Sequence, residues 1–119
     1  MEYNSDFRYD LKVGQVAEQA LAKIFEGKKV EVKRDRKACL TGNIFVEYES
    51  RGKPSGISTT EADYWCFMVE ETFILLATPR LKEIVASLKG SDRERQGGDN
   101  NTSSGVLIRI SDIINTHNK

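Results

Sequence analysis

Two short runs of this chain alternate apolar and ionic residues, and this pattern limits the folds that it can adopt. Within residues 28–37 apolar side chains stand at positions 30 and 32, and within residues 43–50 at positions 44, 46 and 48, with mostly charged side chains between them. Side chains of a strand point alternately to the two faces of a sheet, so the pattern predicts two strands. The intervening ACLTG predicts that they form an antiparallel hairpin with a loose turn, with Glu31 or Lys33 opposite Glu47. One face would enter the core, and the other would carry Glu31, Lys33, Asp35, Glu47 and Glu49.

The remainder of the chain contains further segments with helical or strand periodicity. Apolar residues at helical spacing predict a helix over residues 13–25, which Gly27 closes. Two apolar runs at 63–69 and 72–78 predict a pair of strands, with Glu70 and Glu71 at the turn between them. The other expected segments are a loose lead-in at 1–10, a loop at 51–60, a helix at 78–89, a mobile loop at 90–105, a strand at 106–110 and a terminal turn or frayed helix at 111–119. This order predicts an α/β fold in one domain, with a mixed, mostly antiparallel sheet flanked by helices.

Length and composition exclude several classes of protein. A chain of 119 residues forms one modest core, and its longest apolar run is about a third of the length needed to cross a membrane. Cys39 and Cys66 have neither the number nor the spacing of a disulfide framework or a metal site, so we expect free thiols and a cytoplasmic location. His117, the one histidine, lies in a polar tail, which argues against histidine-based hydrolysis.

The predicted ionic face contains four acids and one lysine. Ordinary cross-strand ion pairs, such as Lys33 with Glu47, are one explanation for such a face. They cannot neutralise it, because the acids outnumber the lysine and like charges on neighbouring strands repel. A divalent cation would offset this repulsion, and Mg²⁺ needs only two or three carboxylates. Net charge is zero, with a basic rim formed by Lys28, Lys29, Lys33, Arg34, Arg36 and Lys37.

Glu18 is a further candidate acid, at the border of the apolar stripe of the first predicted helix. Gly14 lies one turn before it and leaves room for a ligand or another backbone. A helix laid on the sheet would direct Glu18 towards the edge of the sheet, whereas simple solvation is the alternative for a glutamate on a helix.

The combination of an acid on the first helix, an acid on a strand and acid-x-lysine on its partner resembles the PD-(D/E)xK nuclease superfamily. The chain is most similar to its small phage-type and Holliday-junction-resolvase-like members. The stretches that carry the resemblance are VGQVAEQALAKIF, VEVKRD, TGNIFVEYESRGKPSGI, TTEADYWCFMV, FILLATPRLKEIV and GVLIRISDI. The resemblance implies a restriction-endonuclease-like core and Mg²⁺-dependent cleavage of DNA phosphodiesters, with Mn²⁺ as a substitute, in a bacterial or phage-infected cell.

The resemblance also implies roles for particular residues. Glu18 takes the place of the helix acid, Asp35 that of the motif aspartate and Glu47 that of the strand glutamate. The expected metal ligands are Asp35, Glu47, Glu31 and Glu18. Glu49 stands where the family has its lysine, so we expect Lys33 to have taken that role, with Lys53 in reserve. Alternatively, EVK at 31–33 is the true motif and its aspartate lies elsewhere.

The segment RGKPSG after the second strand predicts a contact with the DNA backbone through Arg51, Lys53 and Ser55, although an ordinary flexible turn has the same composition. We expect a homodimer, because a nuclease domain of this size has little surface with which to hold DNA alone. Two rival functions stay open: a DNA-binding protein of the same fold without catalysis, and a cation-binding or assembly module that does not bind nucleic acid.

Overall fold

The computed structural model describes residues 15, 16, 18, 19 and 21–114. The expected lead-in at 1–10, Gly14 and the tail with His117 lie outside these residues. Within the described part, no helix has the length and apolar character that a membrane span requires. Cys39 and Cys66 are both free thiols.

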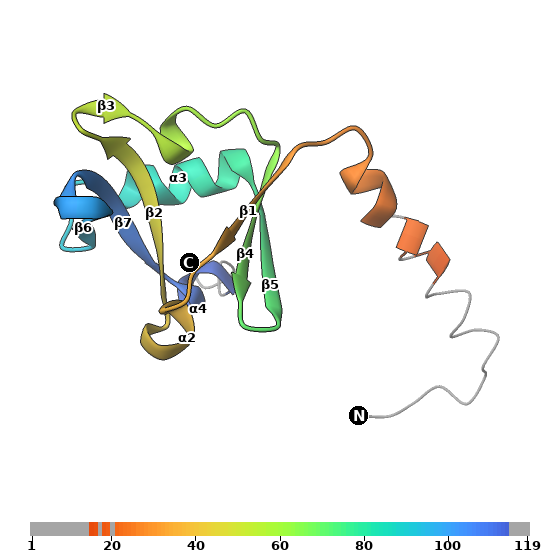
Figure 1. The fold of residues 1–119 in the computed structure, drawn as a ribbon. Helices are drawn as coiled ribbons and strands as arrows, with labels where there is room; N and C mark the ends of the chain where they lie inside the picture. Colours follow the sequence, from red (N-terminus) through yellow and green to blue (C-terminus); the bar gives the residue numbers. More distant parts are fainter. Residues whose placement is uncertain (1–14, 17, 20, 115–119) are drawn as a thin grey trace.

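The described chain forms an α/β fold with one mixed and one antiparallel sheet flanked by helices (Figure 1). Residues 15, 16, 18, 19 and 21–25 are helical, and we call them the N-terminal helix. They are followed by β1 (Val30–Arg34), α2 (Ala38–Thr41), β2 (Asn43–Ser50), β3 (Lys53–Pro54), the 3-10 helix η1 (Gly56–Ser58), β4 (Tyr64–Val69), β5 (Thr72–Ala77), α3 (Thr78–Leu88), β6 (Glu94–Gly97), the 3-10 helix η2 (Asp99–Asn101), β7 (Ser103–Arg109) and α4 (Ile110–Ile114).

The first sheet has the strand order β1-β4-β5. β1 lies parallel to β4, with Val30 beside Tyr64 and Arg34 beside Met68. β4 and β5 form an antiparallel hairpin, and Glu70 at its turn has a left-handed backbone with φ of 56°. This confirms the predicted strand pair with Glu70 and Glu71 between its members.

The second sheet is antiparallel, with the strand order β3-β2-β7-β6. Its register shifts between Glu47 and Glu49, because Glu47 pairs with Gly105 whereas Glu49 pairs with Ser104. Tyr48 is the extra residue of this β-bulge. Bulges of this kind redirect side chains and are common beside functional sites.

The predicted hairpin of residues 28–37 with 43–50 is wrong. The segment read as a loose turn contains the helical turn α2, whose Ala38 is fully buried, and the strands on either side join different sheets. The expected faces of β1 are also reversed, since Val32 is 56% exposed. Glu31 lies beside Trp65 in the register, on the face that β4 turns to the core. β1 is an edge strand, so its alternate residues reach only the margin of that core.

The expected mobile loop at 90–105 contains secondary structure. β6 lies within it and pairs with β7 from Glu94 opposite Val106 to Gly97 opposite Ser103. β7 therefore begins three residues earlier than the predicted strand at 106–110. Gly97 and Gly105 leave space for the ring of Phe45, because a Cβ at either glycine would lie within 3.1 Å of that ring.

The core lies between the two sheets and α3, which contacts β4, β5 and β7. Proline near its first residue favours the start of α3, and its buried residues include Leu81 and Val85. The buried hydrophobic residues are Ala38, Ile44, Val46, Ile57, Trp65, Phe67, Leu81, Val85, Val106, Ile108 and Ile113. Ile44 and Val46 alternate with Phe45 and Glu47, so the period-two prediction for β2 is confirmed.

Candidate functional site

A pocket of about 440 Å³ lies where the end of β1 faces β2. Its lining residues are Lys33, Arg34, Asp35, Arg36, Lys37, Phe45, Glu47, Gly56, Trp65 and Phe67. Three of the four predicted catalytic residues, Lys33, Asp35 and Glu47, are among them. Lys33 lies in β1, Asp35 directly after it, and Glu47 in β2 of the other sheet. Arg34, Arg36 and Lys37 give the same pocket a cationic rim.

Asp35 is held in place by backbone groups on both sides of the pocket. Its Oδ1 accepts a hydrogen bond from the N–H of Lys37 at 3.1 Å, and its Oδ2 accepts one from the N–H of Phe45 at 3.2 Å. The second bond joins the segment after β1 to β2. Asp35 therefore fixes the relative position of the two strands, and its carboxylate still has free lone pairs.

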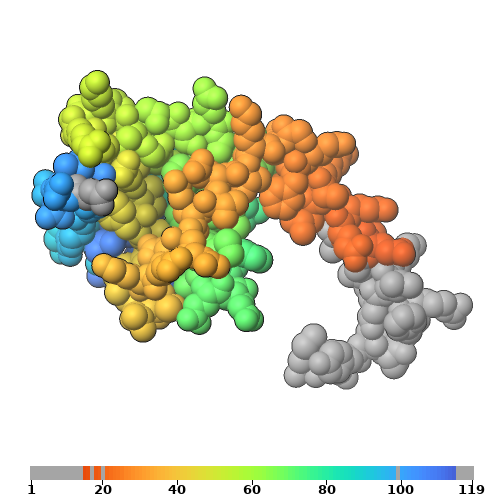
Figure 2. Space-filling model, in the orientation of Figure 1, coloured from red at the N-terminus to blue at the C-terminus, as the bar shows by residue number. Residues whose placement is uncertain are grey.

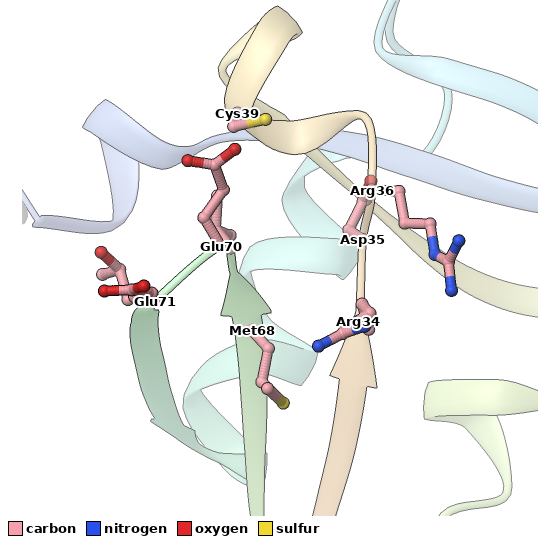
Figure 3. Close-up of a pocket in the computed structure, with 9 residues that line it drawn as sticks. Arg34, Asp35, Arg36, Cys39, Met68, Glu70 and Glu71 are labelled. Carbon is pink, nitrogen blue, oxygen red and sulfur yellow. The ribbon is translucent and has the colours of Figure 1, made fainter.

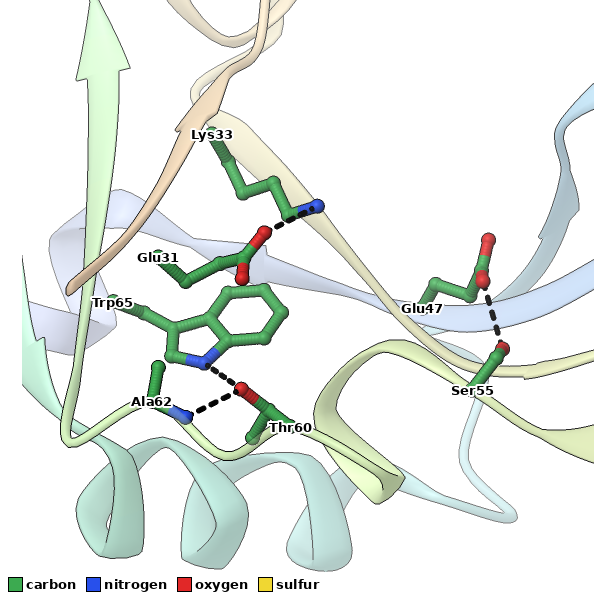
Figure 4. Close-up of polar contacts among 7 residues, drawn as sticks. All are labelled: Glu31, Lys33, Glu47, Ser55, Thr60, Ala62 and Trp65. Carbon is green, nitrogen blue, oxygen red and sulfur yellow. Dashed lines mark hydrogen bonds and ion pairs between the residues drawn. The ribbon is translucent and has the colours of Figure 1, made fainter. Parts of the chain in front are cut away.

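Lys33 is positioned by an acid and an aromatic ring (Figure 4). Its Nζ lies 3.0 Å from Oε2 of Glu31 and 5.5 Å from the centroid of the Trp65 ring. Trp65 is only 3% exposed, and its Nε1 donates a hydrogen bond to Oγ1 of Thr60 at 3.2 Å. Trp65 thus belongs to the core and also lines the pocket. Glu31 does not line the pocket but holds the ammonium group that does.

Glu47 is oriented by the loop that follows β3. Ser55 donates a hydrogen bond of 2.7 Å to Oε2 of Glu47, as Figure 4 shows. Gly56 follows with φ of +54°, and a Cβ at this position would lie 2.3 Å from the carbonyl oxygen of Glu47. Only glycine permits this approach. The sequence predicts a DNA contact for Ser55, whereas the structure places its hydroxyl on the carboxylate of Glu47. The sequence PSG at 54–56 is the one local indication of this close approach.

Arg51 and Lys53 do not line the pocket. Both are exposed, Arg51 at the turn between β2 and β3 and Lys53 at the start of β3. The N–H of Arg51 donates a hydrogen bond to the carbonyl of Thr102 at 2.9 Å. Glu49 also lies outside the pocket, opposite Pro54 on one side and Ser104 on the other. The residue that replaces the expected lysine is therefore separated from Glu47 by the bulge at Tyr48.

Glu18 is exposed on the N-terminal helix, which extends away from both sheets (Figure 1). Across the described residues, no three acidic, cysteine or histidine side chains gather as ligands for a metal ion. The structure thus brings Asp35 and Glu47 to one pocket but does not bring Glu18 or Glu31 into a common ligand set with them. Two hydrogen-bonded carboxylates are nevertheless a donor set that suits Mg²⁺, which retains waters and takes phosphate oxygens of a substrate.

A second pocket of about 860 Å³, whose lining residues Figure 3 draws, shares Arg34, Asp35 and Arg36 with the first. Cys39 and Glu70 lie on its wall. Desolvation, followed by a hydrogen bond with Glu70, raises the pKa of the Cys39 thiol above its ordinary value. The thiol is therefore less ionised at neutral pH than an ordinary cysteine, and this pocket has no activated nucleophile at Cys39.

No protein-family model, no curated protein and no solved structure matches this chain.

Proposed function

We propose that this protein is a Mg²⁺-dependent DNA endonuclease of the PD-(D/E)xK type, which hydrolyses phosphodiester bonds. One observation carries the proposal: Lys33 of β1, Asp35 directly after it and Glu47 of β2 line a single pocket with a cationic rim. The proposal includes a restriction-endonuclease-like core. The order of β1, β2, β4, β5, α3 and β7 along the chain agrees with such a core, whereas the division into two sheets is not implied by the resemblance.

Asp35 and Glu47 would hold the metal ion. When bound, Mg²⁺ polarises the scissile phosphate and lowers the pKa of a coordinated water. The backbone N–H groups of Lys37 and Phe45 keep the Asp35 carboxylate in place, and the hydroxyl of Ser55 does the same for Glu47. Such outer contacts orient ligating carboxylates before the ion binds. Mn²⁺ prefers similar oxygen ligands and should replace Mg²⁺.

Lys33 would stabilise negative charge on the phosphate during cleavage, or orient the attacking water. Contact with Glu31 and the face of Trp65 restricts where its ammonium group can lie. A preorganised cation of this kind costs little reorganisation when charge develops in the transition state. Arg34, Arg36 and Lys37 would bind neighbouring phosphates, and Arg51 and Lys53 would contact the DNA backbone farther from the pocket.

Cleavage of three DNA forms tests this proposal. Linear, supercoiled and four-way-junction DNA are incubated with the protein in Mg²⁺, in Mn²⁺ and in EDTA. We expect cleavage in both metal ions, no cleavage in EDTA, and a preference for branched DNA of the kind found in phage or mobile elements. DNA binding without cleavage in either metal ion would contradict the nuclease assignment.

A second candidate function is DNA binding without catalysis on the same fold. Two observations favour it: Glu49 replaces the family's lysine, and the described residues contain no group of three metal ligands. This candidate predicts DNA affinity that falls steeply with salt and does not depend on Mg²⁺. Failure to bind any of the three DNAs would instead favour a cation-binding or assembly module.

A further inference from the structure

The sheet β1-β4-β5 turns one face to the core and leaves an apolar face in contact with solvent. Residues paired across strands share a face, so the core side carries Trp65 and Phe67. The other side, which we call the outer apolar face, consists of Val30, Val32, Tyr64, Cys66, Met68, Phe73, Leu75 and Ala77. Phe73 is 65% exposed there, and Val32 56%. Contiguous exposed apolar residues of this kind are a feature of interaction surfaces.

The N-terminal helix has an apolar stripe that is exposed as well. Val16 is 58% exposed, Leu21 52% and Ile24 40%, and these residues recur at helical spacing. A helix of this length is marginal in water unless its apolar side packs against another element. One chain thus has two apolar surfaces without a partner among the described residues.

Phe25, at the end of the N-terminal helix, connects these two surfaces. Its ring meets the ring of Tyr64 edge-on, with 6.2 Å between the centroids, at the margin of the outer apolar face. Beyond this contact the helix leaves the body of the molecule, as Figures 1 and 2 show. In this arrangement the stripe cannot cover the sheet of its own chain.

We propose that the N-terminal helix of a second copy packs on the outer apolar face, so that two chains exchange helices in a symmetric homodimer. The exchange covers both surfaces in each chain and continues the contact that Phe25 begins with Tyr64. Each helix–sheet contact occurs twice in such a dimer, which doubles the buried apolar area. Arg34, at the end of β1, is the one charged residue in the register of this face, so the remainder of the face is free to receive an apolar stripe.

A disulfide trap tests the exchange, because Cys66 lies in the middle of the outer apolar face between Val32 and Leu75. Leu21→Cys is introduced into a Cys39→Ser background, mild oxidant is added, and products are separated under non-reducing conditions. We expect a covalent dimer in which the introduced thiol is joined to Cys66 of the other copy. The matched control is Ala22→Cys, which places its thiol on the opposite side of the helix and should give little product.

The trap distinguishes helix exchange from two alternatives, a helix that folds back onto its own sheet and a random collision between chains. A linked product of monomer mass would show that the helix folds back onto its own sheet and would overturn the exchange. Equal yields from Leu21→Cys and Ala22→Cys would also overturn it, because random collision does not depend on the helix face.

Sedimentation provides a measurement that needs no cysteine. The wild-type chain should sediment as a dimer, and Leu75→Asp should raise the dimer dissociation constant by about 100-fold or more, because the dimer would bury an unpaired charge. Circular dichroism checks that the variant keeps its secondary structure. A wild-type monomer at high concentration, or a folded Leu75→Asp variant that dimerises as well as wild type, would contradict the proposal.

Discussion

The carboxylate of Asp35 accepts a hydrogen bond from the backbone N–H of Phe45 across the gap between the two sheets, at 3.2 Å. The same carboxylate also accepts one from the N–H of Lys37. A single side chain therefore fixes both the turn after β1 and the distance of that turn from β2. The pocket between them depends on this contact.

We predict that Asp35→Ala destabilises the protein. The change leaves the half-buried N–H of Phe45 without its acceptor, and a lost partner of this kind costs about 1–3 kcal/mol, whereas water can replace the acceptor at the exposed N–H of Lys37. Urea unfolding measures the effect. Glu61→Ala is the control, because its ion pair with Lys29 is highly exposed and should contribute no more than about 0.5 kcal/mol. Equal stability of the two variants would show that Asp35 does not hold the strands.

Gly56→Ala should disturb both the fold and the pocket. Gly52→Ala introduces only the strain of a left-handed residue, about 1–2 kcal/mol, because its added Cβ meets no other atom. Gly56→Ala adds a clash with the carbonyl oxygen of Glu47, so we expect a loss of at least about 3 kcal/mol. Thermal unfolding of the two variants side by side gives the comparison, and equal losses would contradict the close approach at Glu47.

Tyr48 should make the stability of the protein fall as the pH rises through the alkaline range. Its hydroxyl donates a hydrogen bond to Glu94, and this bond, together with desolvation and the charge of Glu94, raises the pKa of Tyr48 from 10.0 to about 12. The pKa of Tyr48 is higher in the folded than in the unfolded protein. The hydrogen bond therefore contributes its full stabilisation below pH 10.0, and this stabilisation is lost as the pH rises towards about 12. Unfolding measured across this range should show a steeper decline for wild type than for Tyr48→Phe. Parallel curves would exclude the bond as the cause.

Lys33 and Lys53 should differ in the step that they affect. Lys33→Ala removes a charge beside the proposed metal ligands, and we expect cleavage to fall by about two to three orders of magnitude while DNA binding changes little. Lys53→Ala should weaken DNA binding and reduce its salt slope by about 1, with turnover at saturating DNA near wild type. Single-turnover cleavage and binding titrations on one DNA separate the two effects. Loss of turnover in Lys53→Ala alone would reverse the assignment.

Local patterns were sufficient to predict several elements. β2 has the predicted bounds, because Ile44, Val46 and Tyr48 recur at every second position within Asn43–Ser50. α3 begins at the predicted Thr78, and a proline near its first residue marks that start in the sequence. In both cases the signal lies within the element itself, so no distant contact is needed to recognise it.

Strand pairing could not be read in the same way. β1 pairs with β4, a partner distant in sequence, and nothing in VEVKR specifies that choice. Ala38 is small and apolar, which fits both a turn and a buried helical residue, so residue types alone do not distinguish α2 from the predicted loose turn. β1 turns Glu31 to the core side because the register places Glu31 beside Trp65. This register is known only once β1 is paired at the edge of the sheet.

The pocket was predicted in part, although the strand pairing that suggested it is wrong. Lys33, Asp35 and Glu47 still meet because Asp35 binds a backbone N–H of β2 instead of facing a partner strand. The contact of Ser55 with Glu47 depends on the path of the loop through Gly56, which residue types alone do not define.

Metal-dependent cleavage by Glu47→Gln and Glu49→Gln tests the central claim most directly. The two residues lie on the same strand, but only Glu47 lines the pocket, so the pair separates a role at the site from a general effect of charge. With DNA bound equally, we predict that Glu47→Gln lowers the single-turnover rate in Mg²⁺ by at least about 100-fold and that Glu49→Gln cleaves within a few fold of wild type. Cleavage by Glu47→Gln at the wild-type rate would contradict the assignment of this pocket as the catalytic site.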